Sequence, residues 1–121
     1  MTHHFINATL IDPENGTEFS GSVSVEGGRI TAVAEGGIAN PKGEIINCGG
    51  KYLAPGIVDL GVKVCEPGER HKESYRSAGL AAAKGGVTTM ITRPDTNPAI
   101  DSPETLEFVT RRANEASPVH V

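Results

Sequence analysis

The sequence has little cysteine and no long apolar run, and each absence excludes a class of protein. Only two cysteines, Cys48 and Cys65, occur among its 121 residues, so we expect no disulfide framework and a reducing compartment. No apolar stretch is long enough to cross a bilayer. Residues 1–5 lack the basic start and apolar core of a signal peptide. We therefore expect a cytoplasmic protein with no membrane partner.

The chain also has fewer basic residues than acidic ones. The chain has 11 Lys and Arg against 15 Asp and Glu, which gives a formal net charge of −4. A mildly acidic chain gives no reason to expect nucleic acid as a partner. With 37% apolar residues and this length, the composition is that of a globular protein with room for one small domain.

Short strands separated by turn residues fill the first part of the chain. Strands are predicted at residues 5–10, 21–25, 29–34, 44–48 and 51–53. An Asp-Pro-Glu-Asn-Gly cluster and a Gly-Gly pair supply turns between the first three. We interpret residues 1–54 as the N-terminal part of a small β-sandwich domain.

From residue 55 onward the pattern alternates between strands and helices. Strands are predicted from residue 55, at 87–93 and at 119–121, with helices at 72–84 and 103–116. Ser102 is a suitable N-cap, and Pro103 suits the first helical position. This order predicts an α/β fold with right-handed parallel crossovers.

Each predicted helix has a face suited to packing. In the first helix the small or aromatic residues on this face are Tyr75, Gly79, Ala82 and Ala83. In the second helix the apolar residues at helical spacing are Leu106, Val109 and Ala113. We expect these residues to lie against the sheet.

The stretch Pro-Gly-Ile-Val-Asp-Leu-Gly-Val-Lys-Val-Cys-Glu-Pro-Gly, residues 55–68, organises the chain. Read with a period of two, it predicts a buried strand with one wholly apolar face, formed by Val58, Leu60, Val62 and Val64. The opposite face is mixed and contains Asp59, Gly61, Lys63 and Cys65. Polar residues on the inward face, near the carboxyl end of a strand, are typical of a barrel that carries an active site.

This stretch resembles the first barrel strand of the dihydroorotases in the cyclic amidohydrolase superfamily. The resemblance extends over essentially all of the chain. It implies that residues 55–121 are the first three strands and two helices of a (β/α)₈ TIM-type barrel. Such a barrel usually needs about 250 residues, so we expect these residues to be the N-terminal portion of a chain about three times longer.

The residues that carry the family's chemistry are replaced here. In dihydroorotases the two positions occupied by Gly61 and Lys63 are metal-binding histidines. The position of Cys65 is an arginine that holds the substrate carboxylate. The position of Asp95 is an asparagine, in a Met-Pro-Asn-Thr-Asn-Pro-like turn that reads Arg-Pro-Asp-Thr-Asn-Pro here. The framework is kept while the metal and substrate positions have changed.

The resemblance therefore implies a non-catalytic homologue of pyrimidine biosynthesis, with no catalytic residue and no metal cofactor. In some bacteria such homologues are structural chains of aspartate transcarbamoylase, so we expect that partner or a homo-oligomer. One alternative is an active, zinc-dependent cyclic amidohydrolase with an altered site, which hydrolyses a cyclic amide C–N bond. Another is a small-anion binding module that uses Lys63 and Arg93. The plainer interpretation of both cations is that they pair with carboxylates such as Asp95.

Overall fold

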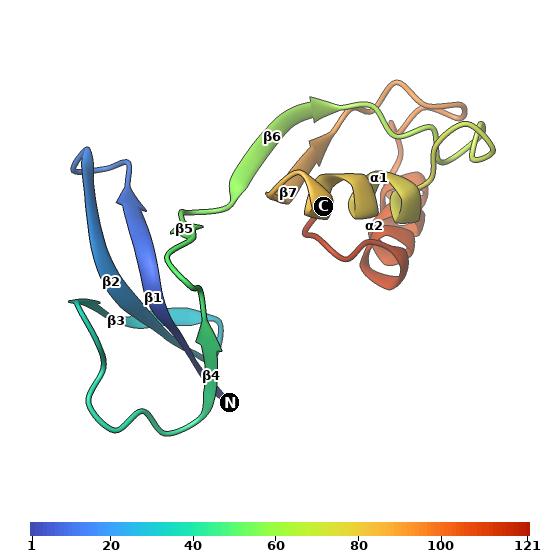
Figure 1. Ribbon diagram of the computed structural model, residues 1–121. Helices are drawn as coiled ribbons and strands as arrows, with labels where there is room; N and C mark the ends of the chain where they lie inside the picture. Colours follow the sequence, from blue (N-terminus) through green and yellow to red (C-terminus); the bar gives the residue numbers. More distant parts are fainter. The chain divides into compact units, whose positions relative to one another are not determined.

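The computed structural model describes residues 1–121, which divide into two units, Met1–Pro55 and Gly56–Val121 (Figure 1). The first unit contains only strands, and the second combines strands with both helices. Neither helix has the length and apolar character needed to cross a membrane.

The first unit is a single five-stranded sheet. Its strands are β1 (Thr2–Asp12), β2 (Thr17–Glu26), β3 (Arg29–Glu35), β4 (Glu44–Asn47) and β5 (Tyr52–Leu53). The order is β3-β2-β1-β4, and β5 also pairs with β1. Neighbours among β1, β2 and β3 are antiparallel, whereas β4 and β5 run parallel to β1. All five predicted strands are present. A sandwich needs a second sheet, so the sandwich domain stays a prediction.

Local sequence explains the hairpin between β2 and β3. Gly27 and Gly28 both have positive φ, 57° and 76°, which glycine adopts without steric penalty. The buried core of this unit is small. Its members are Ala8, Leu10 and Val23, with Phe5, Phe19, Val25, Cys48 and Leu53 packed around them.

The second unit has a parallel pair of strands and two helices. Its elements are β6 (Ile57–Val62), α1 (Tyr75–Lys84), β7 (Val87–Thr92) and α2 (Pro103–Ala116). β6 and β7 are parallel neighbours, as the crossover pattern predicts. The strand predicted at 119–121 is reduced to one parallel bridge, between Thr89 and His120.

The helices follow their capping residues. α1 begins at Tyr75 rather than at residue 72, because the Ser74 side chain caps it by accepting a hydrogen bond from the Ser77 N–H over 3.1 Å. α2 begins as predicted, with Ser102 as N-cap and Pro103 in the first turn.

The core of the second unit lies between the sheet and the helices. Its buried residues are Val64, Tyr75, Ala78, Met90, Val109 and Ala113. Two of the expected packing residues are exposed instead of buried. Ala83 is exposed, with Ala78 buried in α1 instead, and Leu106 is 56% exposed.

The prediction that this strand has one wholly apolar face is wrong, because β6 contains a bulge at Gly61. Leu60 pairs with Ile91 and Val62 pairs with Thr92, so β6 has one more residue than β7 in this interval. Paired residues share a face and consecutive residues alternate, which places Leu60 and Val62 on opposite faces. Val62 packs against the helix-side core, whereas Leu60 is 76% exposed.

The prediction that this strand is buried is therefore also wrong for these residues. Ile57, Val58 and Leu60 are all more than half exposed. Both helices pack on the Met90 side of the sheet, and no element of residues 56–121 covers the other side. The apolar content of this strand indicated burial, but within residues 56–121 these side chains are exposed.

Candidate functional site

The predicted site residues meet at the carboxyl ends of β6 and β7. Lys63 directly follows β6, and Arg93 directly follows β7. The N–H of Arg93 donates to the carbonyl oxygen of Val62 over 2.9 Å, which ties the two strand ends together. In open parallel sheets, ligands bind beyond this end of the strands. The placement makes this edge the candidate site of the second unit.

Asp95 is the centre of a three-residue charge cluster at this edge. Its Oδ1 accepts from Arg93 Nε over 3.1 Å, and its Oδ2 accepts from Arg93 Nη2 over 2.7 Å. Lys63 Nζ lies 3.5 Å from the same Oδ2. The two parallel bonds from Arg93 form the bidentate geometry that guanidinium groups make with carboxylates. The predicted pairing of these cations with a carboxylate is therefore present in the structure.

The surroundings of Asp95 favour its charged form. Desolvation alone would raise the pKa of the Asp95 carboxyl. The hydrogen bond and charge of Arg93, with the charge of Lys63, outweigh desolvation and hold the pKa below its ordinary value. Asp95 is therefore an anion at neutral pH, and its charge is already neutralised within the chain.

A cavity of about 90 Å³ lies beside this cluster. Cys65, which is half-buried, lines it together with Lys63 and Asp95. The remaining lining residues are Val64, Pro67, Glu69, Thr96 and Asn97. The structure thus brings three of the four site residues onto one cavity wall, and Arg93 reaches that wall through Asp95.

A larger cavity, of about 280 Å³, lies in the first unit. Its lining residues are Asn7, Ala8, Ser20, Gly21, Gly36, Gly37 and Gly50. None of them is charged, and none is a predicted site residue. We therefore place the candidate site at the smaller cavity, where the ionisable side chains converge.

Gly61 has no side chain, and its backbone is in the left-handed region, with φ of +83°. A Cβ added there would meet no atom within 4 Å. Space is therefore available, but the conformation is one that residues with a side chain rarely adopt.

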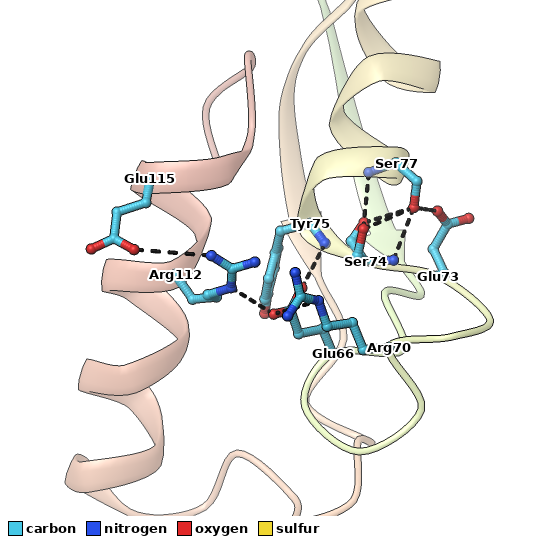
Figure 2. A network of polar contacts seen from close by, with 8 residues as sticks. All are labelled: Glu66, Arg70, Glu73, Ser74, Tyr75, Ser77, Arg112 and Glu115. Atoms are coloured by element: carbon cyan, nitrogen blue, oxygen red, sulfur yellow. Dashed lines mark hydrogen bonds and ion pairs between the residues drawn. The ribbon is translucent and has the colours of Figure 1, made fainter.

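Sequence reasoning missed the buried carboxylate of Glu66, which is 4% exposed (Figure 2). Its Oε1 accepts from Arg112 Nε over 2.8 Å, and Arg70 Nε lies 3.7 Å away. Its Oε2 accepts from the backbone N–H of Tyr75, the first residue of α1, over 3.1 Å. Glu66 therefore joins the loop after β6 to both helices. Its position in the loop after β6 gives no local signal of this role, and its arginine partner is 46 residues away.

Comparison with known proteins places these residues in a family. A family model described as dihydro-orotase-like matches residues 50–121. A dihydroorotase of Wolbachia sp. subsp. Brugia malayi is 43% identical over 121 residues, which cover 97% of this chain. The chain belongs to the dihydroorotase-like family. A dihydroorotase of Bacillus cytotoxicus is 39% identical and covers the whole chain.

The dihydroorotase-like chain spans 27% of the length of the Wolbachia relative and 28% of the Bacillus one. Among solved structures, the L-hydantoinase of Arthrobacter aurescens matches 97% of the chain with a TM-score of 0.86 at 22% identity, over 26% of its own length. A D-hydantoinase matches with a TM-score of 0.78 at 24% identity. At such identities the likeness concerns the fold, which is that of the N-terminal region of hydantoinase-like cyclic amidohydrolases.

Gly61 and Lys63 stand at the two positions where the family resemblance implies metal-binding histidines. Neither residue fits a metal ion. Gly61 offers no donor atom, and a protonated Lys63 ammonium has none free to bind a cation. Lys63 is instead directed at Asp95. No group of three or more His, Cys, Asp or Glu side chains in residues 1–121 is arranged to hold a metal. The candidate site is thus an ion-pair cluster at the place where the family resemblance implies a metal.

Proposed function

We propose that this chain is part of a dihydroorotase homologue that does not hydrolyse dihydroorotate. The observation that carries the proposal is the Lys63–Asp95–Arg93 cluster. It puts a cation at a family metal position and a carboxylate at a family substrate position, 3.5 Å apart. A lysine beside a dication would be repelled by about 8 kcal/mol at 4 Å and an effective dielectric near 20.

The substrate side of the site supports the same proposal. Asp95 replaces a neutral amide of the family with an ionised carboxylate, which accepts hydrogen bonds but has none to donate to an anionic substrate. Cys65 replaces a guanidinium that would have bound the substrate carboxylate with two hydrogen bonds. Its thiol is at best a weak donor. Metal and substrate contacts are therefore both altered within one cavity wall.

The exposed face of β6 supports the finer fold assignment, in which β6 and β7 begin a (β/α)₈ barrel. Val58 and Leu60 are 56% and 76% exposed, respectively. Apolar strand residues of this kind are covered on both faces in a complete α/β barrel. Further strands and helices of a longer chain would bury them.

A homologue that keeps the fold of the family but has lost its catalytic residues can still contribute by assembling with another protein. We propose a cytoplasmic role in pyrimidine biosynthesis, with aspartate transcarbamoylase as the partner or a homo-oligomer as the assembled form. Co-purification with aspartate transcarbamoylase is the expected result. Elution of the intact protein as a free monomer in its presence would contradict the assembly role.

The test of non-catalysis uses the intact protein, purified without chelator. We expect no dihydroorotate hydrolysis above the background rate and near-zero zinc and manganese by elemental analysis. Turnover at an ordinary enzyme rate, with one or two metal ions per chain, would overturn the proposal.

A second candidate is an active cyclic amidohydrolase with an altered site. The observation in its favour is that a relative 43% identical to this chain is a dihydroorotase. Such an enzyme would need zinc ligands from residues outside 1–121 and a substrate that tolerates Lys63 and Asp95. A screen of cyclic amides with the metal-loaded protein separates the two candidates, because only the active enzyme opens a ring.

A further inference from the structure

The charge cluster at the 90 Å³ cavity points to a ligand site that its own carboxylate occupies. We propose that Lys63 and Arg93 form a binding site for a small oxyanion, a single carboxylate or phosphate group, and that Asp95 is its internal competitor. The proposal goes beyond the absence of catalysis and does not depend on it, because anion binding needs no turnover.

The geometry of Arg93 is that of a guanidinium bound to an oxyanion. Its Nε and Nη2 each donate to a different oxygen of Asp95, at 3.1 and 2.7 Å. A free carboxylate or phosphate presents a matching pair of oxygens to the same fork. The side chains of Arg93 and Lys63 are 52% and 56% exposed, so an external anion can reach both.

The charges around the cavity leave a surplus that an anion would neutralise. Lys72 pairs with Glu69, which lines the cavity, and this pair is balanced. Asp95 alone faces two cations, Lys63 and Arg93. Lys72 and Arg93 do not line the cavity themselves. Counted with the lining residues that they pair with, they bring the total to three cations against two carboxylates, and this cluster therefore attracts a further anion even while Asp95 is in place.

The size of the cavity limits what can enter. A volume of about 90 Å³ accommodates only a few water molecules. A space of this size suits one carboxylate or phosphate group. The Thr96 and Asn97 residues on the wall add polar groups that can accompany such an anion.

Asp95 is the partner that can be displaced. Its side chain is 44% exposed and bonds only to the side chains of these two cations. Rotation of one side chain would therefore release both cations without moving a strand or helix. While Asp95 is bound, it lowers the affinity for any external anion, because the two compete for the same donors.

The test measures anion binding by isothermal titration calorimetry on the intact protein, with inorganic phosphate and with succinate as separate probes. Asp95→Asn keeps the shape of the side chain and removes its charge. We expect this variant to bind one of the two probes at least about tenfold more tightly than the wild type, a change of about 1.4 kcal/mol. The tighter of the two probes identifies the ligand class.

The matched control is Asp101→Asn, which changes the net charge by the same amount at an exposed carboxylate with no ion pair in the structure. Its affinity should stay within about twofold of the wild type. Adding Arg93→Gln to Asp95→Asn should abolish the gain. An equal gain in both single variants, binding that survives loss of Arg93, or no binding of either probe to Asp95→Asn would each overturn the proposal.

A measurement on the wild type keeps the test independent of how the variant folds. The Nε–H of Arg93 gives its own NMR signal, and its partner in the free protein is Asp95. We expect saturating phosphate or succinate to shift this signal in the wild type, at higher concentration than in Asp95→Asn. A signal that neither probe moves would contradict displacement of Asp95.

Discussion

Two carboxylates in the second unit both pair with basic side chains, but one is buried and the other is exposed to solvent. Glu66 contacts Arg112 and Arg70, and Asp95 contacts Arg93 and Lys63. The Glu66 side chain is 5% exposed, whereas that of Asp95 is 44% exposed. Glu66 also accepts from the backbone of α1, and Asp95 bonds to neighbouring side chains alone.

Burial decides what each ion-pair cluster can do. A buried carboxylate cannot exchange its partners for water, so removing either partner leaves an uncompensated charge in the interior. An exposed carboxylate can make that exchange at little loss, since water replaces the lost bonds. We therefore assign Glu66 to the fold and Asp95 to the site, and the experiments below test this division.

The largest expected effect is that of Glu66→Ala. Breaking a buried ion pair by removing one partner costs about 3–5 kcal/mol. We expect about 3 kcal/mol less free energy of unfolding, near the lower limit, because the Arg112 side chain remains 26% exposed. Urea unfolding followed by circular dichroism measures it.

Glu115→Ala is the matched control for Glu66. Glu115 also contacts Arg112, at 4.0 Å, but its side chain is 61% exposed. Its removal should change stability by less than about 0.5 kcal/mol. Equal losses in the two variants would show that burial does not distinguish them.

The next effect concerns Gly61, whose bulge lies two residues before Lys63 of the Asp95 cluster. Gly61→Ala places a side chain in open space but in the left-handed region. We expect a loss of about 1–2 kcal/mol from backbone conformation alone. Thermal unfolding measures this loss as a lower Tm.

Gly37→Ala separates conformation from space. A Cβ at Gly37 also meets nothing within 4 Å, and its φ lies outside the left-handed region. This variant should be neutral or slightly stabilising, because alanine reduces the freedom of the unfolded chain. Similar losses of stability in the two variants would mean that a side chain at Gly61 does not strain the backbone of the bulge.

The sequence predicted what depends on local pattern and resemblance. Ser102, Pro103 and the Gly27-Gly28 turn placed helix and hairpin boundaries, because capping and positive φ are local properties. The residues of the charge cluster were also identified in advance. The pairing of Lys63 and Arg93 with Asp95 was one of several interpretations. Sequence spacing does not determine where a long, exposed side chain points.

What the sequence did not predict depends on register and on distant partners. The period-two interpretation of β6 failed at Gly61, because one bulged residue moves every side chain before it to the other face. The role of Glu66 was missed because Arg112 is 46 residues away and belongs to another helix. Neither feature leaves a local pattern in the sequence.

The smallest expected effect is on stability at Asp95, and its pH dependence sharpens the comparison. The pKa of Asp95 is lowered in the folded chain, so its contribution is present above the unfolded value of about 3.9 and is lost as pH falls through the folded value. Asp95→Asn should therefore be slightly less stable than the wild type at pH 7, and the difference should shrink as the pH falls through the lowered pKa of Asp95. Added salt should narrow the difference at pH 7, because exposed pairs are screened. Urea midpoints across this pH range measure the effect. A difference at pH 7 as large as that of Glu66→Ala would move Asp95 from the site to the fold and remove the basis for treating it as a displaceable group.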